Sequence, residues 1–174
     1  LVWIGKIVKS LDPDMPTNIN PNGSCDRWDF AKSVDNIGMS LHPGHWFSRW
    51  QMSELPVMVN YQMDEVRSSL KKNPYWITEL QGGPNTFSGS RSLTPRYHHI
   101  KQWVWNSRAS NANCIIFWMW YTHFYHWEAG EWSMLDMRGK PSERMFAVRD
   151  AVSEMERHAS LLRNAKRKPA KTAI

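Results

Sequence analysis

The chain has 174 residues, of which 41% are hydrophobic and 22% are charged, and its formal net charge at pH 7 is +6. These values are ordinary for a soluble globular protein, and the length suffices for one domain with a real core. The most apolar run, Cys114 to Tyr121, has the length of one buried strand. It falls far short of the roughly 18 apolar residues of a membrane-spanning helix, so we expect no membrane partner.

Helices and strands alternate along the first part of the chain. Apolar residues spaced by three and four positions begin the sequence, and Pro13 and Pro16 end that pattern. The segment VDNIGMSL is typical of a strand, closed by the turn residues from His42 to Gly44. In chain order we predict a helix over 1–10, a strand over 16–20, a helix over 26–33, a strand over 34–41, and a helix within 53–70 that begins beyond Pro56.

The second part continues the same rhythm. We predict a strand over 75–81, a helix with Thr94 as its N-cap and Pro95 in its first turn, and a strand over 113–121. The last strand is apolar on both faces, as in a parallel sheet covered on both sides. A long loop over 122–141 leads to a helix from about Ser142. The buried faces predicted for the two helices are Tyr97, Ile100, Val104 and Ser107, and Met145, Val148, Val152, Met155, Ala159 and Leu162.

This alternation indicates βαβ units and therefore a parallel α/β sheet. Four such units make half of a (β/α)₈ barrel, the TIM-barrel architecture. We expect the four strands to be parallel and adjacent in sequence order, with the helices outside. Residues 1–165 would form this half-barrel, and 166–174 a linker into a following domain. Because the sequence opens in mid-pattern at Leu1, we expect a fragment of a longer protein.

The two cysteines, Cys25 and Cys114, are too few for a disulfide framework or a zinc cluster. We expect Cys114 to be a buried free thiol, with a single Cys25–Cys114 disulfide as the alternative. Free thiols favour a reducing compartment such as the cytoplasm, and nothing else in the sequence indicates a localisation.

Function in a parallel α/β sheet gathers where the strands end and the loops begin. Glu79 stands out there, because a carboxylate interrupts the apolar strand YWITELQ and a buried charge is costly unless it is paired or used. A glutamate paired inside the barrel for structural reasons is the alternative. The other polar or aromatic strand-end residues are Asn18, Asn20, Ser40, His42, Gln81, Trp118 and Trp120, and Asn85 lies in the loop after Glu79.

The loop after the last strand supplies further candidates. Trp118 and Trp120 point to one face of that strand; we expect Trp118 in the core and Trp120 beneath a sugar ring. The chain has 11 tryptophans, and core packing is expected for most of them. Glu128 and Glu131 can hydrogen-bond sugar hydroxyls, the alternative being two solvated carboxylates. His42 and Asn85 complete the predicted substrate-binding residues.

Other chemistries have less support. His98 and His99 are adjacent on a helix, so their side chains diverge by about 100°, and His123 and His126 lack a third ligand at a suitable spacing. The sequence contains neither a phosphate-binding glycine loop nor a nucleophile elbow. We therefore expect no metal and no cofactor.

A basic run ends the chain: Arg163, Lys166, Arg167, Lys168 and Lys171. Such a run can contact phosphates, which makes a nucleic-acid-binding protein one alternative. A solvated helix end and linker is the interpretation we prefer.

Four stretches resemble the catalytic barrel of glycoside hydrolase family 42, the bacterial β-galactosidases. LDPDMPTNIN resembles the approach to the fifth strand, and FAKSVDNIGMSLHP resembles the sixth. YWITELQGGPN resembles the seventh strand, which carries the nucleophilic glutamate of the family. CIIFWMWYTHFYHWEAGEWSMLDMRGKPSERMFAV resembles the eighth strand, its sugar-binding loop and the closing helix. The resemblance covers about residues 1 to 165.

Residue by residue, the resemblance assigns Glu79 as nucleophile, Trp120 as the tryptophan under the sugar, and Glu128 as the loop glutamate that holds hydroxyls. Two positions depart from the family: Tyr121 stands where many members have arginine, and Glu131 where many have histidine. The resemblance thus implies retaining hydrolysis of terminal β-galactosides, with the acid/base glutamate upstream of Leu1 and possible homo-oligomers of the whole protein. A non-catalytic carbohydrate-binding half-barrel is the rival interpretation.

Overall fold

The computed structural model of the chain describes residues 2–21, 25–46, 51, 53–70, 75–85 and 92–168. Its four strands form one sheet in the order β1-β2-β3-β4, and every neighbouring pair is parallel. The predicted α/β class, with parallel strands adjacent in sequence order, is therefore confirmed. The strands are β1 (Asn18–Ile19), β2 (Asn36–Leu41), β3 (Tyr75–Gln81) and β4 (Cys114–Trp118).

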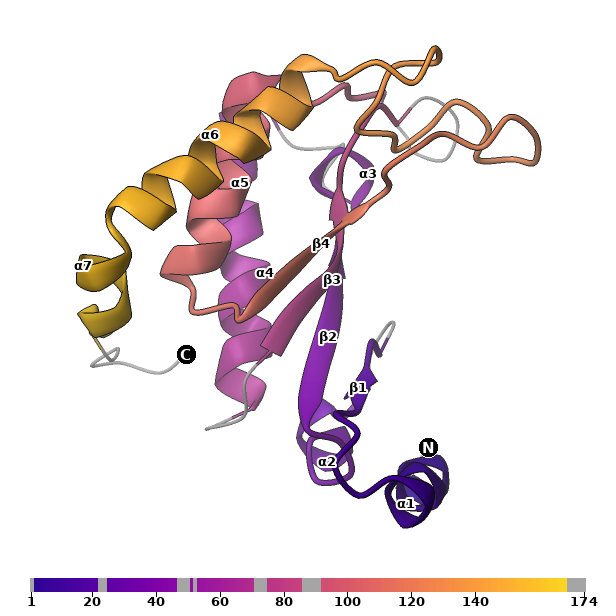
Figure 1. Cartoon of the computed structure of the whole chain (residues 1–174), viewed down its shortest axis with the longest axis vertical. Coiled ribbons are helices and arrows are strands. Elements are labelled where there is room, and N and C mark those ends of the chain that lie inside the picture. The colour runs from indigo at the N-terminus through magenta and orange to yellow at the C-terminus, as the bar shows by residue number, and fades with distance from the viewer. Residues whose placement is uncertain are drawn as a thin grey trace.

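Three long helices cover one face of this sheet. Figure 1 shows α4, α5 and α6 side by side along that face, while the loop after β4 extends toward the opposite face. The helices are α1 (Val2–Leu11), α2 (Arg27–Phe30), α3 (Pro43–Trp46), α4 (Leu55–Ser69), α5 (Tyr97–Ala109), α6 (Glu143–Arg157) and α7 (Ala159–Asn164). This is the arrangement of an open half-barrel with its helices outside.

The core lies between the sheet and these helices. Alternate strand residues such as Ile37 and Ile77 are fully buried there, against Val59, Ile100 and Ala147 from the three helices. Full burial of such an aliphatic side chain contributes about 1.5–3 kcal/mol. Apolar side chains recur every two residues in the strands and every 3.6 residues in the helices, and both sets lie in one apolar layer.

Three strands are shorter than predicted: β1, β2 and β4. β1 and β2 begin late because Thr17 N donates to Asp35 Oδ2 at 2.8 Å, a side-chain contact that precedes the ladder. β4 ends at Trp118 because Met119 N donates to Trp132 O at 2.9 Å and not to a neighbouring strand. The expectation that both faces of β4 are covered is wrong for the described residues, since Ile116 is 46% exposed.

Two helix starts also differ from the prediction. α4 begins at Leu55, and Pro56 lies in its first turn, where the missing N–H leaves no hydrogen bond unmade. α5 begins at Tyr97 with Arg96 as N-cap, so Thr94 is not the cap. The free N–H of Tyr97 instead donates to Glu143 Oε2 at 3.3 Å, a contact from a distant helix that no local pattern reveals.

The C-terminal helix differs most. It divides into α6 and α7 at His158. The buried residues of α6 include Ala147 and Ala151, each one position before a residue of the predicted buried face (Val148 and Val152), and Val152 is exposed.

α3 was not predicted at all. Cys25 and Cys114 are both free, as predicted, but Cys114 is half-buried and not buried. No helix in the described part is both long enough and apolar enough to span a bilayer.

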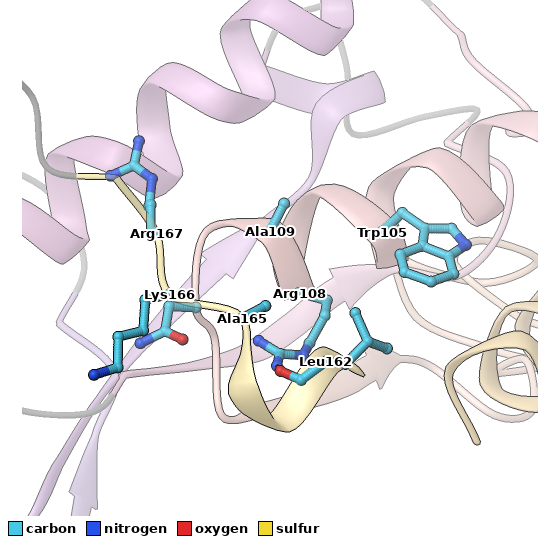
Figure 2. Close-up of a pocket in the computed structure, with 8 residues that line it drawn as sticks. Trp105, Arg108, Ala109, Leu162, Ala165, Lys166 and Arg167 are labelled. Atoms are coloured by element: carbon cyan, nitrogen blue, oxygen red, sulfur yellow. The ribbon is translucent and has the colours of Figure 1, made fainter. Parts of the chain in front are cut away.

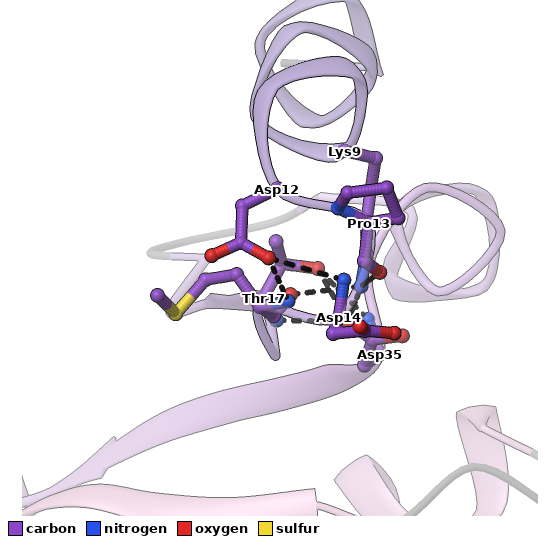
Figure 3. A network of polar contacts seen from close by, with 7 residues as sticks. Lys9, Asp12, Pro13, Asp14, Thr17 and Asp35 are labelled. Atoms are coloured by element: carbon purple, nitrogen blue, oxygen red, sulfur yellow. Dashed lines mark hydrogen bonds and ion pairs between the residues drawn. The ribbon is translucent and has the colours of Figure 1, made fainter.

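A polar network ties α1 and its following turn to the start of β2 (Figure 3). Lys9 Nζ lies 2.8 Å from Asp35 Oδ2 and also donates to Met15 O at 2.8 Å. Thr17 adds hydrogen bonds to the same carboxylate through its N–H and its Oγ1. These donors, Lys9 first, lower the pKa of Asp35 to about 2. The network therefore fixes β1 beside β2 without a long ladder.

Candidate active site

Glu79 lies near the carboxyl end of β3, on the face away from the three helices. Strict alternation would place it with Ile77 on the core side. The register is irregular here: Met39 pairs with Ile77, but Ser40 pairs with Glu79. This extra residue in β3 has the effect of a β-bulge. It turns Glu79 out of the core and returns Leu80 to it.

One oxygen of Glu79 is held by two neighbours on or just after β2. Ser40 Oγ donates to Oε2 at 3.1 Å, and His42 Nε2 lies 3.2 Å from the same oxygen. Asn20 Nδ2 in turn donates to Ser40 Oγ at 2.8 Å. None of the described residues hydrogen-bonds Oε1, and the Glu79 side chain is 37% exposed. The carboxylate is thus oriented and yet open to a ligand.

Asn20 and Ser40 were not predicted as site residues, although both stand at the carboxyl ends of their strands. Their positions were the available signal, since parallel strands bring such ends together. Trp132 was also missed. Its ring packs edge-on against His42, with centroids 4.9 Å apart, and so fixes the imidazole beside Glu79.

Buried amides connect the loops around this carboxylate. Gln81 Oε1 accepts from Gly44 N at 2.7 Å, and Gln81 Nε2 donates to Gly83 O at 3.0 Å. Asn85 Nδ2 donates to Gly44 O at 3.0 Å, and Asn85 is fully buried. The loop after β3 is thereby joined to the segment that follows β2.

The loop after β4 carries the remaining predicted residues. Trp120 is 63% exposed, Glu128 is half-buried, and Glu131 is fully buried. Trp118 is half-buried beside His123, with ring centroids 6.4 Å apart. Of the predicted binding residues, His42 alone hydrogen-bonds Glu79 in the described part of the chain.

The described residues hold no group of three His, Cys, Asp or Glu side chains arranged for a metal. A pocket of about 250 Å³ lies elsewhere, between the end of α5 and the end of α7. Figure 2 shows that its cations Lys166 and Arg167 extend in different directions. Arg167 pairs with Asp64 at 2.9 Å, and Arg108 donates to Leu162 O at 2.5 Å. Arg108 and Arg167 are thus engaged in contacts within the chain and do not converge on a ligand.

The basic C-terminal run is only partly described. Arg167 contacts Asp64 of α4, whereas Lys171 lies outside the described residues. Nucleic-acid binding by this run therefore stays a prediction.

Solved structures share this fold. A β-galactosidase from the Antarctic haloarchaeon Halorubrum lacusprofundi superposes with a TM-score of 0.78 at 18% identity, over 89% of this chain and 25% of that chain. One from the psychrophilic Marinomonas ef1 gives 0.78 at 15% identity, over 92% and 26%. A catalytic mutant of Gan42B, a family 42 β-galactosidase from G. stearothermophilus, gives 0.75 at 20% identity, over 94% and 25%.

At these identities the likeness shows the fold alone, a portion of a TIM barrel. The chain spans about a quarter of the length of these galactosidases. No curated protein matches the chain in sequence. The sequence model of the family described as β-galactosidase, glycoside hydrolase family 42, does match, over residues 4–158. The chain therefore belongs to glycoside hydrolase family 42.

Proposed function

We propose that the chain supplies the second half of a retaining β-galactosidase barrel, with Glu79 as the catalytic nucleophile. The observation that carries this proposal is the placement of Glu79. A register irregularity turns its carboxylate to the open face at a strand end, where Ser40 and His42 orient one oxygen. A carboxylate needed only for packing would not have to be held with its second oxygen accessible.

The reaction follows from this geometry. Glu79 Oε1 attacks the anomeric carbon of the terminal galactose, and the bond to the leaving oxygen breaks as a glycosyl ester forms. Ser40 and His42 keep Oε2 in place, which limits rotation of the carboxylate during attack. A second carboxyl group, about 5–5.5 Å away in retaining enzymes, protonates the leaving oxygen and then activates water. We assign that group to a part of the barrel outside this chain.

The predicted binding residues divide by exposure. Trp120 is exposed and Glu128 half-exposed, so we assign them to direct contact with the sugar ring and its hydroxyls. His42, Asn85 and Glu131 are buried. We propose that these three act mainly by positioning Glu79 and the loops around it. No cofactor takes part in this scheme, and 166–174 joins the barrel to a further domain.

Replacement of Glu79 in the full-length protein tests the proposal. Glu79→Gln should lower turnover by about a thousandfold or more, the scale seen when a catalytic nucleophile is lost, because an amide cannot form the ester. Galactose binding and the fold should persist, since the amide has the same size. Glu128→Gln, a matched carboxylate on the loop, should cost only about 1.5–3 kcal/mol, the value of a charged hydrogen bond.

Azide separates these roles further. A small anion can occupy the space left by Glu79→Gly and produce a galactosyl azide of inverted configuration. The same azide should have no effect on Glu128→Ala. A fluorinated galactoside should label the peptide that contains Glu79. A protein that binds galactosides but shows no turnover, no labelling and no azide product would be the non-catalytic carbohydrate-binding alternative.

A further inference from the structure

Hydrogen bonds between side chains link the carboxyl ends of three neighbouring strands. Asn20 directly follows β1, Ser40 lies in β2 and Glu79 lies in β3. Asn20 Nδ2 donates to Ser40 Oγ at 2.8 Å, and Ser40 Oγ donates to Glu79 Oε2 at 3.1 Å. Ser40 is buried and Asn20 is half-buried, so water competes little for these bonds. We call these three residues the relay, since one hydroxyl group connects the amide of Asn20 to Glu79.

The donor and acceptor chemistry of the three groups fixes the direction of the relay. An amide nitrogen only donates and an ionised carboxylate only accepts, whereas a serine hydroxyl has one proton and can do both. Because Asn20 Nδ2 donates to Ser40 Oγ, the single proton of Ser40 stays available to Glu79. With the opposite orientation of the amide, Asn20 Oδ1 would compete with Glu79 for that proton. The observed orientation thus makes Ser40 a donor to the carboxylate.

Neither strand pairing nor packing accounts for the amide of Asn20. Asn36 N donates to Thr17 O at 3.0 Å, and Thr17 N donates to Asp35 Oδ2 at 2.8 Å, so these contacts already hold β1 beside β2. Asn20 Oδ1 is buried and has no hydrogen-bond partner among the residues that the structure describes. A buried acceptor without a partner is destabilising, and an aliphatic side chain of similar size would avoid that cost. The bond from Asn20 Nδ2 to Ser40 is what remains to explain the residue.

We propose that Asn20 is a positioning residue for the nucleophile and acts by directing the hydroxyl proton of Ser40 onto Glu79 Oε2. This inference rests on the proposed role of Glu79. Consecutive hydrogen bonds polarise one another, so the bond from Asn20 strengthens the bond from Ser40 to the carboxylate. With Oε2 held in this way, Oε1 is left to face the anomeric carbon. Asn20 takes no part in galactose binding in this scheme, so its replacement should lower kcat and leave binding unchanged.

Two replacements of Asn20 in the full-length protein should differ in effect. Asn20→Ala removes the donor but leaves the Ser40 proton free to reach Glu79, so kcat/KM for a galactoside should fall about three- to tenfold, the effect of one neutral hydrogen bond. Asn20→Asp keeps the size but accepts the Ser40 proton itself, so kcat/KM should fall about ten- to a hundredfold, the effect of a lost hydrogen bond to a charged group. The inhibition constant of galactose should stay within about twofold of the wild type in both variants.

Asn164→Asp is the matched control for the change of amide to carboxylate. Asn164 is an exposed residue of α7 whose Nδ2 donates to Ser160 O at 3.0 Å. It lies on a helix outside the relay, so its replacement should change neither kcat/KM nor the inhibition constant. The rate of labelling by a fluorinated galactoside should follow kcat/KM in every variant, because labelling is attack by Glu79 itself.

A double-mutant cycle distinguishes the relay from a structural role of Asn20. Ser40→Ala removes the hydroxyl through which Asn20 acts, so the addition of Asn20→Ala should then lower kcat/KM by less than about twofold. Equal losses from Asn20→Ala with and without Ser40, together with a lower Tm, would mean that Asn20 only supports the fold and would overturn the proposal. Wild-type kinetics in Asn20→Asp would show that the amide accepts from Ser40, which would overturn it as well. If Asn20→Asp does not fold, the alanine cycle still decides, because it introduces no charge.

Failure of the proposed function would give a different pattern. Near-normal turnover in Glu79→Gln would refute the role of Glu79, and the relay with it. Loss of turnover in Glu79→Gln, together with wild-type kinetics in both Asn20 variants, would overturn the relay alone and leave the role of Glu79 intact.

Discussion

Ser40 Oγ donates a hydrogen bond of 3.1 Å to Glu79 Oε2 across the β2–β3 pair. The two residues face each other only because the register shifts after the Met39–Ile77 pair. Without that shift, Glu79 would point into the apolar layer beneath the helices. An unpaired carboxylate there would cost several kcal/mol. The register shift and the hydrogen bond together place the Glu79 carboxylate on the open face of the sheet and not in the apolar core.

Loss of this hydrogen bond should reduce activity more than stability. Ser40→Ala leaves Glu79 Oε2 with His42 as its remaining partner and frees the carboxylate to rotate. We expect kcat/KM to fall by about ten- to a hundredfold, since a hydrogen bond to a charged group contributes about 1.5–3 kcal/mol. Steady-state kinetics with a galactoside would show this. Ser160→Ala, an exposed serine at the start of α7, is the control, and an equal effect there would contradict the argument.

Gly83 should not tolerate a side chain. A Cβ at this position would lie 2.2 Å from Ser133 O and 2.5 Å from Ser133 N, so one backbone would have to move. Such overpacking typically costs about 1–3 kcal/mol. It would also displace the segment that places Trp132 against His42. We expect Gly83→Ala to lower both Tm and kcat.

Gly130→Ala provides the comparison for that prediction. Gly130 has a φ of +81° but nothing within 4 Å of an added Cβ. The substitution should therefore cost only about 1–2 kcal/mol of backbone strain, with kcat retained. Thermal unfolding and kinetics of both variants would separate steric displacement from strain. A normal kcat in Gly83→Ala would show that the loops containing Gly83 and Ser133 can move apart without loss of activity.

The sequence predicted the elements better than their edges. β3 spans 75–81 as expected, because a run of β-branched and aromatic residues lies between turn residues. The start of α5 was missed because Glu143, 46 residues away, binds Tyr97 N. Local periodicity can indicate the span of a strand such as β3. It cannot indicate a contact between residues far apart in the chain, such as the one that sets the start of α5.

The same contrast holds in the site. Glu79 could be identified because a charge in an apolar strand is conspicuous. Its orientation could not, since no Gly or Pro lies within β3 beside Thr78. The glycine that makes room for the Thr78 side chain, Gly38, lies on the neighbouring strand, and only the folded pairing brings the two together. The burial of Glu131 was equally hidden. Its loop has no periodicity, and its path depends on long-range bonds such as Trp132 N to Pro84 O at 2.8 Å.

Asp35 should make the protein acid-sensitive over a defined range. Its pKa is lowered from an ordinary 3.8 to about 2, chiefly by Lys9 and then by Thr17. A group with a lowered folded-state pKa stabilises the fold above its unfolded value and loses that contribution as pH falls through the folded value. The contribution should therefore be complete above about pH 4–5 and lost toward pH 2. Asp35→Asn should remove it at pH 7 and flatten the acid limb of Tm.

Asp14→Asn is the matched control, since Asp14 is an exposed carboxylate of the same turn whose side chain takes no part in the network (Figure 3). Thermal unfolding at pH 2, 3.5, 5 and 7 would compare the three proteins. Identical pH profiles for Asp35→Asn and the wild type would show that Lys9 and Thr17 do not act through this carboxylate.

The 174-residue chain on its own should be catalytically inactive. Retaining hydrolysis needs two carboxyl groups about 5–5.5 Å apart, and we assign the second to the other half of the barrel. Among the described residues, β1 and β4 are the edge strands of the sheet, and the main-chain groups of edge strands promote association of strands. Ile116 also exposes apolar surface on the inner face. We therefore expect the purified chain to aggregate or to pair with another half-barrel, as light scattering would detect.

Addition of the first half of the barrel should restore both a monodisperse species and turnover. The same mixture made with the Glu79→Gln variant of this chain should show no turnover. Robust β-galactosidase activity from a monomer of this chain would contradict the assignment of the acid/base group to another part of the protein.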